Sequence, residues 1–470
     1  MIKKKIIRTL CLAVSVLAFA GLTAGQASSE EADAALHESL KLSLKDAVAM
    51  GVATNPEYGV VAASRRATDE ELKQGKALYL PSVDMRADTG YEYSNDPGTR
   101  AFGKKTETLW RSETSLTLTQ MLFDGFEAKN EVERQQARVA SSANRVRETA
   151  ELVGLSIVEA YLDVIRQREL LGIARQNVED HLSILDQIQT GVTGGRSTQA
   201  DLEQAKARLA AAKATESNTR QALRTAEAKY RSEVGDEAGQ LEMPKVPFDL
   251  LSPDVSQEVE KTLVFSPTLD IFASDIEVAY AEAQKTKSTM YPQVDLQVNG
   301  RTGYDINGVH DRDTSSSALL VMNWNLYRGG ADTARSREFI HRHQQAKERR
   351  AQAAREVEND VRQTWASMVS AGERTREFTA QADANTEVVK AYREQFTLDR
   401  RTLLDVLDAQ NELFVSKSNA INTQFLEAFA VYRLLSLKGA LFPTMGLPYP
   451  AESKVSSGES WSNEEKMDAR

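Results

Sequence analysis

Two aspartates near the C-terminal end of the chain are the residues best suited to act on a charged partner. Asp405 and Asp408 stand three positions apart in the stretch RRTLLDVLDAQ, residues 400–410, and this spacing places both carboxylates on one face of a helix. Acidic residues in the first turns of a helix also stabilise its positive dipole end. The pair therefore has two explanations, a charged site or a helix start, and the surrounding elements must decide between them.

Histidine and cysteine give no second site. The five histidines are His37, His181, His310, His341 and His343. His341 and His343 lie two apart in a helical pattern and point to different faces, so they are poor joint metal ligands. The sequence also has no nucleophile motif, phosphate loop or Cys/His cluster. We therefore predict that the protein is not an enzyme and uses no metal or cofactor.

The N-terminus has the parts of a secretory signal peptide. Four basic residues occur within the first eight positions, residues 10–22 are apolar or small, and further small residues follow. The segment is too short to anchor the mature chain in a membrane. We predict a signal peptide over residues 1–27. Its removal would take away Cys11, the only cysteine, and with it any disulfide or lipid anchor.

The charge balance argues against nucleic acid as a partner. The formal net charge is −10, and removal of residues 1–27, with four positive and no negative charges, would lower it to −14. No basic patch with interleaved aromatic residues compensates for this acidity. We expect an exported, acidic protein that binds no nucleic acid.

The order of sequence signals occurs twice, which indicates an internal duplication. Phe123-Asp124-Gly125 recurs as Tyr327-Arg328-Gly329, offset by 204, and Arg196-Ser197 recurs as Arg401-Thr402, offset by 205. We predict a first repeat over residues 40–235, a linker over residues 236–252 and a second repeat over residues 253–445. Gly125 and Gly329 are predicted to be turn residues between a strand and a helix.

Each repeat contains two segments in which apolar and polar residues alternate. We predict strands at about residues 81–93 and 108–123 in the first repeat, and at about 292–305 and 314–327 in the second. Polar segments separate the strands of each pair, as in hairpins. A soluble sheet with one wet face would show the same alternation.

Very long helical patterns follow each pair of strands. Residues 126–190 and 331–395 contain no strong helix breaker, and each would form a helix of about 95 Å. Residues 197–235 and 402–440 predict two more helices, with a seven-residue step typical of a coiled coil. Asp405 and Asp408 lie off that seam, so packing within a helix pair does not account for them.

The strands and helices together suggest a shared membrane barrel. Four strands cannot close a barrel, and an unpaired strand edge is not tolerated in a bilayer. If the strands cross a membrane, several chains must contribute to one barrel, and three chains would give twelve strands. The polar and charged residues 451–470 are predicted to be disordered.

With these features the chain resembles the TolC family of outer-membrane channel-tunnel proteins over roughly residues 40–445. RRTLLDVLDAQ is similar to the segment of that family at the periplasmic entrance, and GGRSTQADLEQAKARL is similar to its repeat partner. The resemblance implies an α+β membrane protein. It would be a homotrimer whose twelve-stranded β-barrel lies in the outer membrane of a Gram-negative bacterium and continues into a long periplasmic α-helical coiled-coil barrel.

The resemblance also implies roles for particular residues. Asp405 and Asp408 fall on positions that ring the constriction at the entrance, where like charges raise each other's pKa and attract cations. Arg401 falls on a position that ties the mobile helix pair to its neighbours, and Asp201 matches the acidic position of the partner helix. Phe396 departs from the family, which often has Tyr there, so a hydroxyl link to Asp201 cannot form.

The function that the resemblance implies is passive export. The expected partners are a periplasmic adaptor and an inner-membrane ABC transporter, as in type I protein secretion. The alternative is the outer-membrane part of a small-molecule efflux pump, with a proton-driven pump as inner-membrane partner. A periplasmic coiled-coil structural protein is a more distant alternative, because it would not account for four amphipathic strands.

Overall fold

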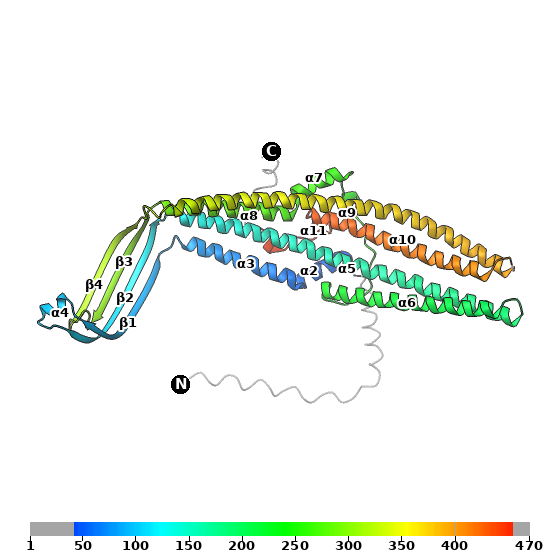
Figure 1. The fold of residues 1–470 in the computed structure, drawn as a ribbon, viewed down its shortest axis with the longest axis horizontal. Helices are drawn as coiled ribbons and strands as arrows, with labels where there is room; N and C mark the ends of the chain where they lie inside the picture. The colour runs from blue at the N-terminus through cyan, green and yellow to red at the C-terminus, as the bar shows by residue number, and fades with distance from the viewer. Residues whose placement is uncertain (1–41, 399, 455–470) are drawn as a thin grey trace, which may run out of the picture.

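The chain is an elongated molecule with a β-sheet at one end and long helices along the rest of its length (Figure 1). The computed structural model describes residues 42–398 and 400–454. The predicted signal peptide, residues 1–27, lies outside the described residues. None of the described helices is long and apolar enough to cross a membrane.

Four antiparallel strands form one sheet in the order β1-β2-β3-β4. The strands are β1 (Ser82–Ser94), β2 (Glu107–Phe123), β3 (Gln293–Tyr304) and β4 (Arg312–Asn323). The two halves of the chain meet at the pairing of β2 with β3, where Leu116 lies opposite Gly300. β1 and β4 each have one edge that no described strand pairs.

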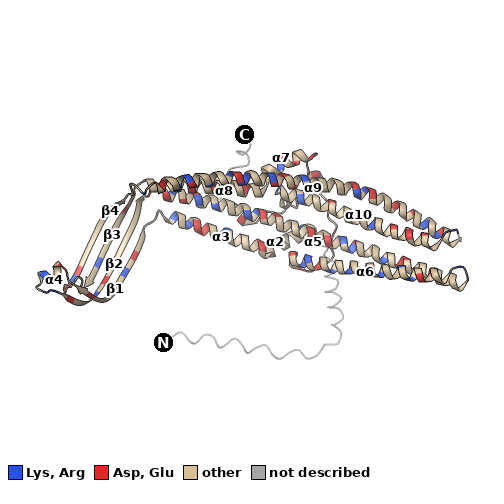
Figure 2. Cartoon of the chain, viewed as in Figure 1, with Lys and Arg blue, Asp and Glu red and all other residues tan. Residues whose placement is uncertain are grey.

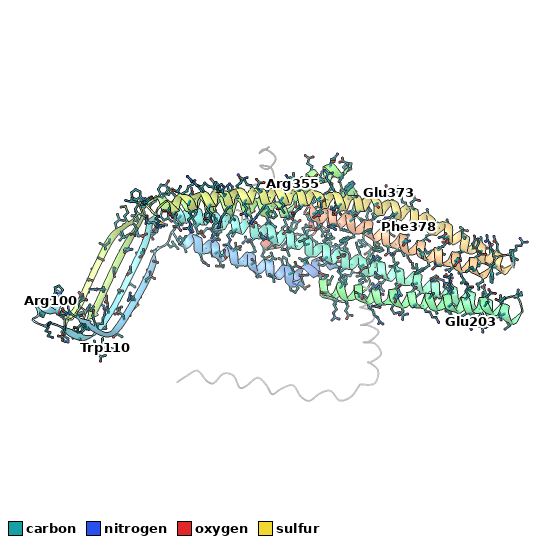
Figure 3. All side chains as sticks on the ribbon, viewed as in Figure 1. Arg100, Trp110, Glu203, Arg355, Glu373 and Phe378 are labelled. Atoms are coloured by element: carbon teal, nitrogen blue, oxygen red, sulfur yellow. The ribbon has the colours of Figure 1, made fainter. Side chains whose placement is uncertain are left out.

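The alternation of the sequence produces two different faces on this sheet. One face, which we call the apolar face, carries Met85, Leu116, Val298 and Leu320. Near the outer end of this face, Tyr91 packs edge-to-face on Trp110 with ring centroids 4.7 Å apart, and Figure 3 shows Trp110 at the surface there. The opposite face, which we call the polar face, carries mostly charged and hydroxyl side chains, with a few apolar ones such as Leu109 and Leu319.

Four helices make up most of the remaining length. α5 (Glu127–Thr193) and α9 (Ala331–Thr397) each contain 67 residues, which corresponds to about 100 Å at 1.5 Å per residue. α6 (Gln199–Val234) packs along α5, and α10 (Leu403–Leu437) packs along α9. The fold class predicted from the sequence is therefore confirmed for the single chain.

Shorter helices flank the long ones in both halves. They are α2 (Leu44–Thr54), α3 (Pro56–Ala77), α7 (Val255–Phe265), α8 (Pro267–Lys285), η1 (Phe248–Leu250) and η2 (Thr286–Met290). α3 and α8 both begin with proline at the first position, where the missing N–H costs nothing and the fixed φ suits a helix. Asn55 caps α3 by accepting a hydrogen bond from the Glu57 N–H (2.8 Å).

The main apolar core lies midway along the helices. Tyr161 of α5 and Tyr230 of α6 are fully buried there. The Tyr161 hydroxyl accepts a hydrogen bond from the Glu242 N–H (2.9 Å) and lies 2.8 Å from the Leu42 carbonyl. Tyr161 therefore ties the N-terminal segment and the segment between the halves to α5.

The first residues of the predicted C-terminal tail are folded in the structure. The tail over residues 451–470 was expected to be disordered, but Ala451–Ser453 form the short helix η3, which contacts α5 and α3. α11 (Leu441–Thr444) precedes it, and the Tyr58 hydroxyl donates to Glu452 (3.1 Å). These tertiary contacts outweigh the polar composition as far as Lys454; residues 455–470 lie outside the described residues.

Candidate functional site: the helix ends farthest from the sheet

The ends of the two long helix pairs farthest from the sheet are built alike. Thr198 caps α6 and Thr402 caps α10, each by accepting a hydrogen bond from the N–H of the aspartate three positions on. Asp201 and Asp405 complete two capping boxes by accepting hydrogen bonds from the backbone N–H of Thr198 (2.9 Å) and Thr402 (3.2 Å). The duplicated sequence signal is thus a duplicated helix start.

Asp405 has the helix-start role that its position allows. Hydrogen bonds from the Thr402 hydroxyl and backbone hold the pKa of Asp405 below its ordinary value, and nearby Arg401 adds to the effect. This direction is opposite to the rise expected from a ring of like charges. Within one chain, Asp405 is a stabilised, ionised carboxylate.

Asp408 has a different environment. It takes no part in the capping box, and 54% of its side chain is exposed. Its carboxylate oxygen lies 3.0 Å from a guanidinium nitrogen of Arg208 on α6. Asp408 therefore joins the two helix pairs, and the sequence offered no signal for a partner 200 residues away.

Arg401 is held by its own helix pair. Its guanidinium lies over the Tyr392 ring, 4.2 Å from the centroid, and donates a hydrogen bond to Gln395 (3.0 Å). It also lies 3.8 Å from Asp405. Among the described residues no ion pair joins Arg401 to the α5–α6 pair, so its expected role in tying its helix pair to neighbouring helices remains a prediction about an assembly.

Phe396 belongs to an apolar cluster that joins both pairs at this end. The buried members of the cluster are Ile184, Ile188, Leu202, Ala205, Leu403, Val406 and Leu407, and Phe396 and Tyr392 pack against them. The phenyl ring of Phe396 thus contributes to packing, while the aromatic partner of Arg401 is Tyr392, one turn earlier.

A polar cluster that sequence reasoning missed lies next to these helix ends. Arg393 of α9 pairs with Asp180 of α5 (2.9 Å) and donates to Gln410 of α10 (3.0 Å), which in turn donates to Asp180 (2.7 Å). His181 is buried beside them, and its burial lowers the pKa of its imidazole. Each residue taken alone reads as an ordinary polar position of a coiled coil, so only the fold reveals the cluster.

The two predicted turn glycines differ in what they require. Gly125 has φ of +69°, and a Cβ there would lie 2.7 Å from the Ser288 carbonyl oxygen. Gly329 has φ of +65° but no atom within 4 Å of that position. Only glycine suits both conformations without strain, and Gly125 is constrained by close packing as well.

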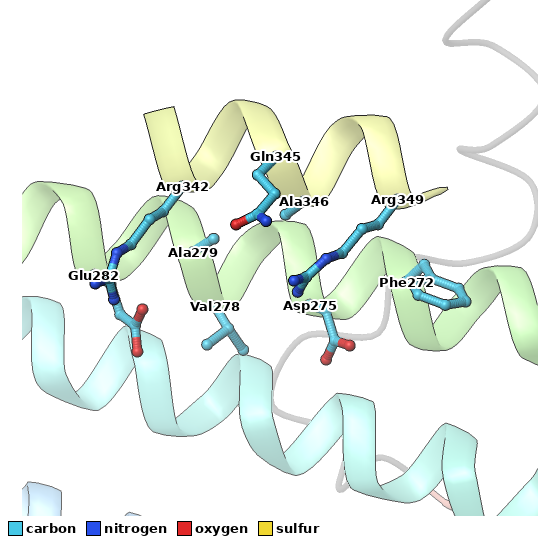
Figure 4. A pocket seen from close by; sticks show the side chains of 9 residues that line it. All are labelled: Phe272, Asp275, Val278, Ala279, Glu282, Arg342, Gln345, Ala346 and Arg349. Atoms are coloured by element: carbon cyan, nitrogen blue, oxygen red, sulfur yellow. The ribbon is translucent and has the colours of Figure 1, made fainter. Parts of the chain in front are cut away.

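A groove on the flank of the molecule is a weaker candidate. It lies between α8 and α9, with a volume of about 420 Å³ (Figure 4). Asp275 and Glu282 line one side, and Arg342 and Arg349 line the other. Because acidic and basic side chains balance, the groove favours neither a cationic nor an anionic ligand. Along the helices as a whole, acidic and basic residues are also interspersed (Figure 2).

Comparison with known proteins places the architecture in a family. The family model described as outer membrane efflux protein matches residues 52–235 and 259–439. Outer membrane efflux protein BepC of Brucella suis is 26% identical over 80% of each chain. Alkaline protease secretion protein AprF of Pseudomonas aeruginosa is 22% identical over 86% of each chain.

Solved structures share the fold at low sequence identity. The outer membrane channel CmeC of Campylobacter jejuni aligns with a TM-score of 0.74 at 12% identity, over 88% of this chain and 89% of that one. The outer membrane protein VceC of Vibrio cholerae aligns with a TM-score of 0.71 at 15% identity, over 87% and 97%.

Proposed function

Because the chain belongs to the outer membrane efflux protein family, we propose that it is the outer-membrane exit duct of a type I protein secretion system. It lies in the outer membrane of a Gram-negative bacterium. The family consists of channels, and the duct conducts its cargo passively.

The observation that carries this proposal is the sheet with one apolar face and two unpaired edges. Met85 and Leu320 on the apolar face are 72% and 68% exposed in the single chain. Lipid satisfies such a face, but a bilayer tolerates no open strand edge. Three copies would close one barrel of twelve strands, with the apolar face toward lipid and the polar face toward the lumen.

The helices continue this duct through the periplasm. The ends of the α5–α6 and α9–α10 pairs form its inner entrance, and a periplasmic adaptor and an inner-membrane ABC transporter engage it there. Opening is a shift between closed and open populations driven by these partners. Asp405 and Asp408 of three copies would line the entrance, with Arg401, Asp201 and Phe396 in the contacts that hold it closed.

The names of two relatives support protein as the cargo. AprF, together with the proteases secretion protein PrtF of Dickeya chrysanthemi, is named for protein secretion. BepC is named for efflux, so small-molecule efflux with a proton-driven pump is the second candidate function. Both functions use the same duct and differ in the inner-membrane partner.

A deletion strain separates the two candidates. The gene would be deleted in its own organism and restored on a plasmid, with the empty plasmid as control. If the duct serves secretion, specific proteins disappear from the culture supernatant and return with the restored gene, while susceptibility to dyes and detergents is unchanged. The reverse pattern would support efflux, and no change in either would contradict an export function.

A further inference from the structure

Two loops at the end of the sheet away from the helices fold over its polar face. We call residues 95–106, which include α4 (Pro97–Ala101), and residues 305–311 the outer loops. Figure 3 shows Arg100 of the first outer loop at the end of the molecule away from the long helices. Gly303 belongs to the polar face, since it lies opposite Glu113 and Asp313. A Cβ on Gly303 would lie 2.4 Å from Cδ1 of Ile306, so Ile306 covers the face at this point.

The second outer loop also lies against β1 and the first outer loop. A Cβ on Gly308, whose φ is +73°, would lie 2.3 Å from the methyl group of Thr99 and 3.0 Å from Cβ of Ser94. Thr99 is fully buried, and Ser94 is on the polar face. The backbone N–H of Asn307 donates to the carboxylate of Glu92 (3.2 Å), also on the polar face. The outer loops are therefore interlocked and rest on the sheet.

The exposure of two neighbouring side chains on β2 also indicates that the outer loops cover the polar face. Leu109 and Trp110 are neighbours on β2 and point to opposite faces. Leu109 on the polar face is 5% exposed, whereas Trp110 on the apolar face is 55% exposed. Leu109 lies at the end of the polar face near the outer loops and is buried because these loops fold over it, whereas Leu319, on the same face near the helices, is 55% exposed.

Beneath the outer loops, pairs of oppositely charged side chains join neighbouring strands of the sheet. The pairs are Arg111 with Asp88 (3.0 Å), Glu92 (3.7 Å) and Glu113, and Arg301 with Glu113 (3.5 Å) and Asp313 (2.6 Å). These residues come from all four strands. Glu92 belongs both to this network and to the Asn307 contact, so the network anchors the second outer loop.

We propose that the outer loops form a constriction at the outer mouth of the duct, separate from the helical entrance, which limits the size of what leaves. The inference rests on the proposed function, in which the polar face lines a shared lumen. Loops that rest on the lumenal face point toward the common axis, so three copies narrow the mouth together. The residues that hold the outer loops in this position are Ile306, Gly308, Thr99 and Glu92.

Asymmetric exclusion of polymers from single channels tests this constriction. The purified full-length mature protein is inserted in planar bilayers, and neutral polyethylene glycols of graded size are added on the outer-loop side or the helical side. Gly308→Val displaces the second outer loop because its side chain would collide with Thr99 and Ser94. Gly103→Val is the matched control, since Gly103 also has positive φ (+78°) but no atom within 4 Å.

We expect the exclusion limit on the outer-loop side to rise about two-fold in polymer mass for Gly308→Val, with no change on the helical side, because pore width sets access. Gly103→Val behaves as wild type. If Gly308→Val yields no channels, Ile306→Ser, which removes the apolar cover over Gly303, makes the same test. Equal limits for wild type and both loop variants overturn the constriction, whereas a wild type that forms no channels overturns the proposed function itself.

Discussion

At the scale of single residues, Asp405 and Asp408 have two different roles. Asp405 completes the capping box of α10 and is explained by the helix start. Asp408 is half-exposed, has no capping role and pairs with Arg208 of the other helix pair. Asp408 is therefore the better candidate for contact with cations at the entrance.

This difference predicts opposite effects from the two members of the pair. Asp408→Asn removes a negative charge from the entrance and should lower the preference of single channels for K⁺ over Cl⁻. Arg208→Gln leaves Asp408 unpaired and should raise that preference. Because both side chains are well exposed, either change should alter the free energy of unfolding by less than about 1 kcal/mol. The measurement is the reversal potential in a salt gradient. If the reversal potential shifted in the same direction in both variants, the charges of Asp408 and Arg208 would not set the selectivity, and the pair would serve only in packing.

The sequence could show that Asp405 and Asp408 share a helical face, but not that Asp408 pairs with Arg208. Capping depends on two residues three positions apart, Thr402 and Asp405, and can be read locally. The Arg208 contact and the cluster of Asp180, Arg393 and Gln410 depend on how four helices meet. Local spacing carries no information about partners 200 residues apart.

At the scale of elements, strands and long helices were predictable because each has its own periodicity. β1 lies within a residue of the segment in which polar and apolar residues alternate, and α9 starts at the predicted position, Ala331. The short helix α4 was missed inside a segment taken for a hairpin loop, although Asp96 followed by proline is a local helix-start signal. The pairing of β2 with β3 was also beyond the sequence, since it joins segments about 180 residues apart.

The C-terminal segment shows how one buried residue fixes an element. Glu151 of α5 is 1% exposed and accepts hydrogen bonds from the Leu441 N–H (3.1 Å) and the Tyr449 hydroxyl. Burial raises the pKa of Glu151 to about 7, although these hydrogen bonds and nearby Arg147 oppose the rise. The folded pKa is above the ordinary value of 4.5, so the contribution to stability is complete below about pH 4.5 and is lost as the pH rises to about 7.

The segment over residues 440–449 should therefore open more readily at pH 8 than at pH 5. The shift corresponds to roughly 3 kcal/mol, measurable as hydrogen exchange of this segment after correction for the intrinsic exchange rate. Glu151→Gln keeps the acceptor oxygen and should abolish the pH dependence. Glu258 is a suitable control because its pKa is shifted in the opposite direction to that of Glu151. Burial opposes the ionisation of Glu258, but hydrogen bonds from Lys438 and Ser252 hold its pKa below the ordinary value. A Glu151→Gln protein that retains the pH dependence would contradict this account.

At the scale of the whole molecule, the described strands leave the outer edges of β1 and β4 without a strand partner. β1 and β4 contain 13 and 12 residues, so neither has the short length that often protects an edge strand. The helices below the sheet are stable as pairs within one chain, with Leu407 and Leu435 fully buried along α10. In the proposed duct, the sheet rather than the helices is therefore where further copies of the chain would be needed.

Two neighbouring positions on β4 test that requirement. Successive backbone N–H groups of a strand point alternately to its two sides, so of Ser316 and Ser317 one donates toward β3 and the other toward the open edge. Proline removes the donor at either position. If β4 ends the sheet, one of Ser316→Pro and Ser317→Pro should be tolerated, because its N–H has no partner. If a neighbouring chain pairs with β4, both should reduce the fraction of trimer seen by native mass spectrometry in detergent. Since the two substitutions alter adjacent serines of one strand, a difference between them would reveal an unpaired edge, and equal loss would support the shared barrel.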